Sequence, residues 1–133
     1  MEPLIHLVEE YLRFRTKLLR VLENINVNRQ EVMDVVNLSG QQLLNRRRKP
    51  ETWTNDELTR LATYLHLDNT ICFHMRKLAV FIDLMPSSQK FYLMRRISIN
   101  ATKMHRRRAN YNTWKVEELQ LLVVTLKNMP VVD

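Results

Sequence analysis

The apolar residues at the start of the chain recur every three or four positions. This spacing places them on one broad face of a helix, whereas strict alternation would indicate a strand. Pro3 suits the first turn of a helix, where the amide that proline lacks would have no partner. The pattern therefore predicts a long helix over residues 3–24. The apolar positions that define its face are Leu4, Leu7, Val8, Tyr11, Leu18, Leu22 and Ile25.

A short helix and a tight turn are predicted next. Asn28 is followed three residues later by Glu31, which is the spacing of a capping box at the start of a helix. Asn37 accepts the left-handed backbone conformation that commonly ends a helix. We therefore expect a helix that begins after Asn28 and ends at Val36.

Two further capping signals follow this turn. Ser39 with Gln42 predicts a helix over residues 40–48, and Thr54 with Glu57 predicts the start of another. Because only about three residues separate the first two short helices, together they form a helix-turn-helix.

The second half of the chain repeats the first with an offset of 61 residues. Residues 28–67 align with residues 89–128 without a gap. A repeat of this length is typical of one small helical unit, so we expect two units, residues 1–67 and residues 68–133. The identical pairs are Met33/Met94, Arg46/Arg107, Arg47/Arg108, Thr52/Thr113, Trp53/Trp114, Glu57/Glu118, Leu58/Leu119, Leu61/Leu122 and Leu65/Leu126.

A tryptophan and a leucine flank the last cap in both copies, at the spacing of a hydrophobic staple. In the first copy the cap is Thr54, but the second copy has Lys115 at that place. The staple is therefore repeated and the cap is not. The staple pairs are Trp53 with Leu58 and Trp114 with Leu119.

Upstream of the aligned segments the offset between the two copies is 60 residues, which aligns residues 16–25 with residues 76–85.

Four segments carry the apolar spacing of a helix-turn-helix and of the helix that closes it. They are NRQEVMDVV-NLS-GQQLLNRRRK and TNDELTRLATYL in the first copy, and FYLMRRI-SIN-ATKMHRRR and KVEELQLLVVTL in the second. They resemble the helix-turn-helix DNA-binding domain of phage repressors, the Cro/XRE type. The resemblance implies an all-α fold of two tandem helix-turn-helix units of about four helices each, packed as an intramolecular pseudo-dimer, with leading helices at 3–24 and 69–85. The matching apolar positions are Val32, Val36, Leu38, Leu43, Leu93, Ile97, Ile99 and Met104.

Two departures from that family concern the turn and the second helix. Asn37 and Ser98 hold the turn where the family commonly has glycine. Arg46 and Arg107 stand where an apolar residue is often buried. The scaffold is therefore compatible with a retained or an altered DNA-binding face.

The resemblance implies that the second helix of each motif lies in the major groove of DNA and presents its first residues to base edges. Glutamine and asparagine amides each give and take a hydrogen bond with adenine, and arginine pairs with guanine. Two alternatives stay open, because Gln42 also suits a cap on Ser39 and Arg106 also suits a phosphate contact. The expected base-contacting residues are Gly40, Gln41, Gln42, Asn45, Thr102, Lys103 and Arg106.

A basic run ends the second helix of each motif. The carbonyl end of the helix dipole favours cations there, but contact with DNA phosphates also explains why both copies carry the run directly after the recognition helix. The expected phosphate contacts are Arg46, Arg47, Arg48, Lys49, Arg107, Arg108 and, through its hydroxyl, Tyr111.

Composition and charge narrow the range of possible functions. A net charge of +7 with 45% hydrophobic residues indicates a folded protein that attracts polyanions. The charge is uneven: residues 1–67 hold 10 Lys+Arg and 9 Asp+Glu (+1), and residues 68–133 hold 11 and 5 (+6). One cysteine, one glycine and four dispersed histidines argue against a disulfide, a metal site, a phosphate-binding loop and an enzyme. We therefore expect a cytoplasmic protein without cofactor, metal or membrane span.

Three functions remain open from the sequence. The first is sequence-selective binding of double-stranded DNA by a small transcriptional regulator. The second is a helical protein-interaction module, an adaptor or antitoxin-like protein, which binds a partner or self-associates through apolar residues of the first long helix, namely Phe14, Leu18 and Leu19. The third is single-stranded nucleic acid binding, which is disfavoured because the candidate stacking residues have helix-core spacing; they are Phe73, Phe81 and Phe91.

Overall fold

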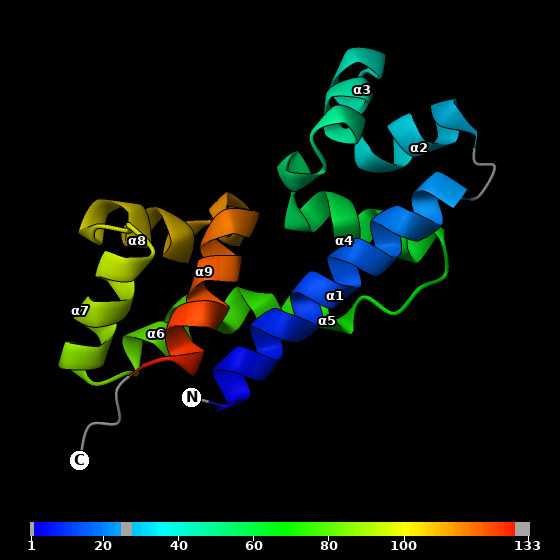
Figure 1. Cartoon of the computed structure of the whole chain (residues 1–133). Helices are drawn as coiled ribbons and strands as arrows, with labels where there is room; N and C mark the ends of the chain where they lie inside the picture. The colour runs from blue at the N-terminus through cyan, green and yellow to red at the C-terminus, as the bar shows by residue number, and fades with distance from the viewer. Residues whose placement is uncertain (1, 25–27, 130–133) are drawn as a thin grey trace.

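The computed structural model of the chain describes residues 2–24 and 28–129, and every regular element within these ranges is a helix (Figure 1). The all-α class is therefore confirmed. Of the predicted apolar positions, Ile25 lies outside the described residues. In chain order the elements are α1 (Glu2–Asn24), α2 (Arg29–Val36), α3 (Gly40–Arg48), the 3₁₀ turn η1 (Pro50–Thr52), α4 (Asn55–Tyr64), α5 (Thr70–His74), η2 (Met75–Lys77), α6 (Leu78–Asp83), α7 (Ser87–Arg96), α8 (Ala101–Ala109), η3 (Tyr111–Thr113) and α9 (Val116–Lys127).

The predicted signals of the first helix-turn-helix are present, except that only the Asn28 half of the Asn28–Glu31 capping box forms, because the Glu31 carboxylate accepts a hydrogen bond from the Tyr64 hydroxyl. The side-chain oxygen of Asn28 accepts hydrogen bonds from two amides in the first turn of α2, at 2.8 and 3.2 Å. Asn37 has a φ of 57°, the left-handed conformation that ends α2. Ser39 and Gln42 form a complete capping box, in which each side chain accepts a backbone N–H from the other residue. As a result, α3 has the predicted bounds.

The second helix-turn-helix has the same turn. Ser98, the counterpart of Asn37, has a φ of 58°. In both turns the next residue donates its amide to a carbonyl five residues earlier, Leu38 to Met33 at 3.1 Å and Ile99 to Met94 at 2.9 Å. The repeat found in the sequence is therefore a repeat of backbone geometry at this turn.

The expected single helix over residues 69–85 is wrong, because α5, η2 and α6 occupy that range. At the break the carbonyl of Cys72 accepts a hydrogen bond at 3.1 Å from Nδ2 of Asn55, which lies on α4. Arg76 stacks on the rings of Phe73 and Tyr111, with its guanidinium carbon 5.1 and 5.0 Å from their centroids. These tertiary contacts hold the tighter 3₁₀ turn, a local change that helical periodicity does not reveal.

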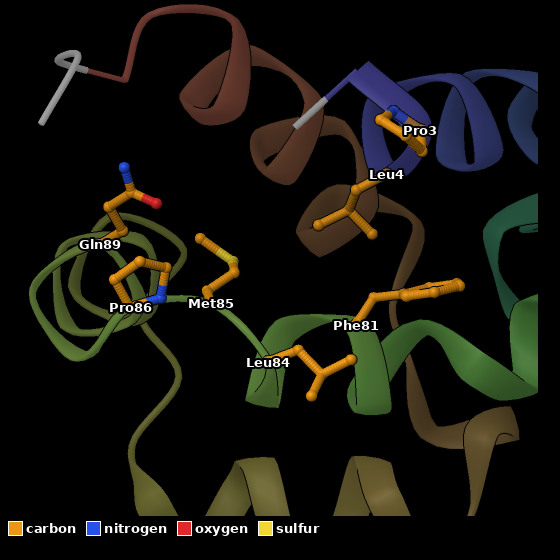
Figure 2. Close-up of a pocket in the computed structure, with 7 residues that line it drawn as sticks. All are labelled: Pro3, Leu4, Phe81, Leu84, Met85, Pro86 and Gln89. Carbon is orange, nitrogen blue, oxygen red and sulfur yellow. The ribbon is translucent and has the colours of Figure 1, made fainter. Parts of the chain in front are cut away.

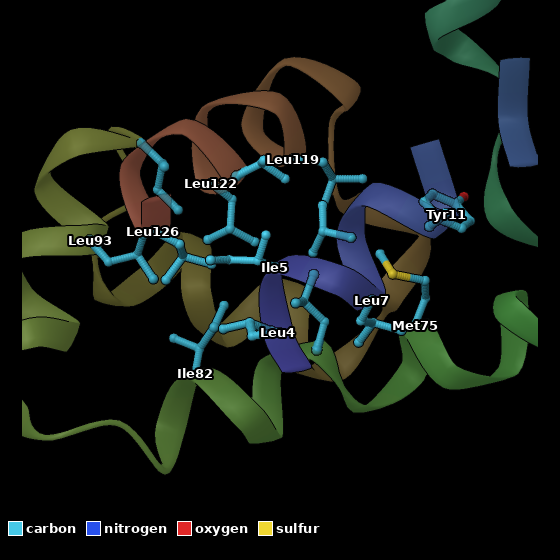
Figure 3. Close-up of a cluster of buried hydrophobic side chains, with 14 of the residues drawn as sticks. Leu4, Ile5, Leu7, Tyr11, Met75, Ile82, Leu93, Leu119, Leu122 and Leu126 are labelled. Atoms are coloured by element: carbon cyan, nitrogen blue, oxygen red, sulfur yellow. The ribbon is translucent and has the colours of Figure 1, made fainter. Parts of the chain in front are cut away.

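Two clusters of buried side chains make up the core, and α1 contributes to both. Its second half, with Leu18 and Leu22, packs against α2, α3 and α4. Its first half, from Leu4 to Tyr11, packs against the helices of the second repeat (Figure 3). The packing thus differs from the predicted division after residue 67. The length of α1 explains this, because 23 residues span about 35 Å at 1.5 Å per residue.

Asp56, in the first turn of α4, joins the two repeats. Its backbone N–H donates to Asn112 Oδ1 at 2.9 Å, and Asn112 Nδ2 donates to its Oδ2 at 2.8 Å. The Tyr111 hydroxyl donates to the other carboxylate oxygen, and Arg76 donates to that hydroxyl at 3.1 Å. Burial tends to raise the pKa of Asp56, but the hydrogen bonds from Tyr111 and Asn112 outweigh it and hold the pKa below the ordinary value of 3.8. Asp56 is therefore an ionised anchor between α4 and η3.

Candidate nucleic-acid interface

The outward face of α3 carries two of the predicted readout residues side by side. Gln41 and Asn45 are exposed one helical turn apart, and Gln41 Nε2 donates a hydrogen bond to Asn45 Oδ1 at 3.3 Å. This bond uses the amino group of Gln41 and the carbonyl of Asn45. It leaves Gln41 Oε1 as an acceptor and Asn45 Nδ2 as a donor, the complement of the N6–H and N7 groups on an adenine edge.

Two other predicted readout residues have local structural roles. The side chain of Gln42 accepts the Ser39 N–H at 2.9 Å, so the capping alternative describes it. Gly40 allows Arg29 to approach: Arg29 NH2 donates to the Gly40 carbonyl at 3.3 Å, and a Cβ at Gly40 would lie only 2.9 Å from that nitrogen. Both residues position the start of α3.

One residue on this face was not predicted. Leu44 lies beside Gln41 and Asn45 on α3 and is 37% exposed. An apolar side chain beside such amides suits a contact with the methyl group of thymine. Its position directly after the buried Leu43 was the available signal, because neighbouring residues on a helix point in different directions.

Arg46 and Arg107 face the protein and not solvent. Each makes a forked ion pair with a glutamate eleven residues later. The Nε–Oε1 distance is 3.0 Å in both pairs, and the NH2–Oε2 distances are 3.4 and 2.9 Å. The side chain of Arg107 is only 7% exposed, against 23% for Arg46. The phosphate contact expected of Arg107 is therefore corrected to a buried pair with Glu118, and Arg46 is similarly engaged with Glu57.

The two glutamates also cap helices. Oε1 of Glu57 accepts the Thr54 N–H at 2.9 Å, and Oε1 of Glu118 accepts the Lys115 N–H at the same distance. In the second repeat half of the capping box thus survives, although Lys115 offers no acceptor in place of the Thr54 hydroxyl. The sequence aligned both glutamates and both arginines, but it gave no sign that they pair.

The other predicted basic residues differ in accessibility. Arg47, Arg48 and Lys49 are exposed at the end of α3. Arg108 is partly exposed, and its Nε and NH2 donate to the two carboxylate oxygens of Asp83 at 2.6 and 2.8 Å. The Arg108 hydrogen bond, aided by Lys90 and opposed by burial, lowers the pKa of Asp83.

Tyr111 donates its hydroxyl to Asp56, so this residue joins the two repeats and does not present the hydroxyl to a phosphate. Burial and the hydrogen bond to Asp56 raise its pKa. On α8, by contrast, Thr102, Lys103 and Arg106 are exposed as predicted.

The two candidate recognition helices lie on neighbouring margins of the molecule. In Figure 1, α3 is at the top and α8 at the left, while α1 and α5 run below and to the right of them. The joint between Asp56 and η3 lies between the two units that carry these helices. The outward residues of both helices therefore project from the same fixed framework.

No protein-family model matches the chain, and no curated protein or solved structure is significantly similar to it. In the described part of the chain, no group of three or more His, Cys, Asp and Glu side chains is arranged to hold a metal ion. None of the described helices combines the length and apolar character needed to cross a membrane.

Proposed function

We propose that the chain is a sequence-selective double-stranded DNA-binding protein of the Cro/XRE helix-turn-helix type, a small transcriptional regulator that inserts α3 and α8 into the major groove. The observation that carries this proposal is the paired turn geometry. Each left-handed residue, Asn37 or Ser98, is followed by a capped helix with exposed polar and basic side chains. Such helices present their first turns to base edges.

An intramolecular pseudo-dimer is part of this proposal. Asp56 of α4 contacts Asn112 of η3, and the counterparts of these two elements, α9 and η1, contribute Val116 and Glu51 to the lining of one cavity. Such a reciprocal placement of elements is expected around a two-fold axis. A two-fold relation favours recognition helices that enter successive major grooves about 34 Å apart.

The two helices would read different half-sites. On α3 the Gln41–Asn45 pair suits adenine and Leu44 suits a thymine methyl. On α8 the exposed residues are Thr102, Lys103 and Arg106, which favour guanine or phosphate contacts. The operator would therefore be asymmetric, with an A·T-containing half under α3.

The test is selection from a random-sequence duplex library, followed by titration of the enriched site at two salt concentrations. We expect a site with two unlike halves about one helical turn apart. Gln41→Ala should weaken binding to the intact site about tenfold and relax selection in one half only. Arg48→Ala, which removes an exposed residue among the expected phosphate contacts, should weaken binding to all sequences and lower the salt slope by about 1.

Gln120→Ala serves as the matched control, because Gln120 is an exposed glutamine on α9 and is not among the expected DNA contacts. It should leave affinity and selection unchanged. Binding that depends on salt but enriches no site would contradict sequence-selective readout, and absence of binding at low salt would contradict the DNA-binding proposal as a whole.

A further inference from the structure

The second repeat exposes apolar residues where the first repeat exposes polar ones. Val80 on α6 is 56% exposed, and Leu84, directly after the end of α6, is 76% exposed. With the 60-residue offset of this segment, their counterparts on α1 are Arg20 and Asn24. The apolar surface is therefore a property of one repeat and not of the shared scaffold.

The aromatic residues of this region correct an expectation from the sequence. Phe73, Phe81 and Phe91 have core spacing, yet all three are exposed. Phe73 and Phe81 flank the break between α5 and α6, and Phe73 lies beneath the guanidinium of Arg76. By contrast, the apolar surplus expected on α1 is covered, because Leu18 is fully buried and the clusters take up Phe14 and Leu19.

Beside this surface a groove runs between the first turn of α1 and α6. One cavity of about 390 Å³ is lined mainly by Pro3, Leu4, Phe81, Leu84 and Met85 (Figure 2). A second cavity, of about 350 Å³, shares Pro3 and Phe81 with the first. The two cavities adjoin at these shared residues, and we call them together the α1–α6 groove.

We propose that the α1–α6 groove, with the exposed face of α6, is the interface through which two copies of this chain form a two-fold dimer. The size of the surface supports this. Val80, Phe81 and Leu84, together with the groove edge, expose roughly 300–400 Å² of apolar area, the range of a functional patch. A standard interface needs about 800 Å² per partner, a little over half of it apolar.

The number and charge of the surfaces favour a second copy as the occupant. Because the described residues of the first repeat expose polar side chains at the positions that correspond to Val80 and Leu84, each chain carries this face once, and pairing the face with itself closes a dimer. The rim of the second cavity carries both signs, including Glu10 and Lys77. When two copies pair around a two-fold axis, their rims therefore do not repel each other as two rims of a single charge would. The dimer would hold two pairs of helix-turn-helix units, and it does not depend on whether these bind DNA.

The test is sedimentation velocity of the full chain over the micromolar range, without nucleic acid. We expect a concentration-dependent monomer–dimer equilibrium. Leu84→Arg should weaken dimerisation by about tenfold or more, because it places a charge at the centre of the interface. Since Leu84 is largely exposed in the monomer, the helical circular dichroism of this variant should be unchanged.

Val124→Arg is the matched control. Val124 is 57% exposed on α9 and does not line the α1–α6 groove, so this variant should dimerise like the wild type. A wild-type chain that stays monomeric throughout would overturn the proposal and leave the groove for a different protein. Dimerisation that survives Leu84→Arg would overturn it as well. DNA binding is measured separately, so failure of one proposal is distinguishable from failure of the other.

Discussion

The two repeats have the same internal skeleton and different surfaces. Both contain a left-handed turn residue, a forked Arg–Glu pair across eleven residues and a glutamate that caps the closing helix. Their outward faces differ. The exposed residues of α3 include amides where α8 exposes basic residues, and α6 exposes apolar residues where α1 exposes polar ones. What both repeats keep is therefore needed to form the unit, and what differs is where separate functions can reside.

The largest expected difference between the repeats concerns the Arg–Glu pairs. Glu118→Ala leaves Arg107 buried without a partner, which should reduce the free energy of unfolding by about 3–5 kcal/mol. Glu57→Ala should cost less, because Arg46 is more exposed and water can solvate it. Urea unfolding of the two variants measures the difference. Equal losses would show that burial does not distinguish the pairs.

A control separates charge burial from packing in this comparison. Replacing Arg107 and Glu118 together by leucine removes both charges and keeps much of the volume, so the double variant should recover a large part of the loss. A double variant as unstable as Glu118→Ala would point to the cap on the Lys115 amide as the main contribution.

A smaller effect is expected at the joint between the repeats. Asp56→Ala removes the acceptor for Tyr111 and Asn112, and should lower stability by about 1–2 kcal/mol near neutral pH. Because folding lowers the pKa of Asp56, its contribution is present above the ordinary value of 3.8 and is lost as the pH falls through the folded-state value. The difference in stability between the wild type and the Asp56→Ala variant should therefore disappear in acid. Thermal unfolding across pH 3–7 measures it, with the counterpart Glu117→Gln, exposed on α9, as control.

The smallest effect compares the two turns. Ser98→Gly should stabilise the chain by about 0.5–1 kcal/mol, because serine is strained at a positive φ and glycine is not. Asn37→Gly at the equivalent φ should change little, since asparagine tolerates this conformation. Chemical denaturation of both variants decides the point; a larger gain at Asn37 would mean that the side chain, and not the backbone, dominates.

Local chemistry made much of this fold predictable. Caps such as Ser39 with Gln42, and the turn at Asn37, depend on residues three or four apart, so the bounds of α2 and α3 followed from the sequence. The break after α5 did not, because it depends on Asn55 and Arg76, whose partners lie on other elements.

The candidate site was predictable to the same extent. The exposure of Gln41 and Asn45 follows from helical spacing, but spacing does not show where a charged side chain finds its partner. Nothing in its basic run distinguishes Arg107 from an exposed arginine. Only the position of Glu118 in the folded chain turns the Arg107 side chain inward. Tyr111 is similar, because its acceptor Asp56 is 55 residues away.

The sharing of α1 between two cores has a consequence for how the chain folds. Leu4 to Tyr11 complete the core of the second repeat, while Tyr64, Leu65 and Leu67, at the end of the first repeat, pack on the first core. Cutting the chain after residue 67 would strip the second core of its α1 layer and would leave Leu4 to Tyr11 uncovered on the first fragment, although that fragment keeps the whole first core. Because α1 contributes to both cores, we expect the two repeats to unfold together as one cooperative unit.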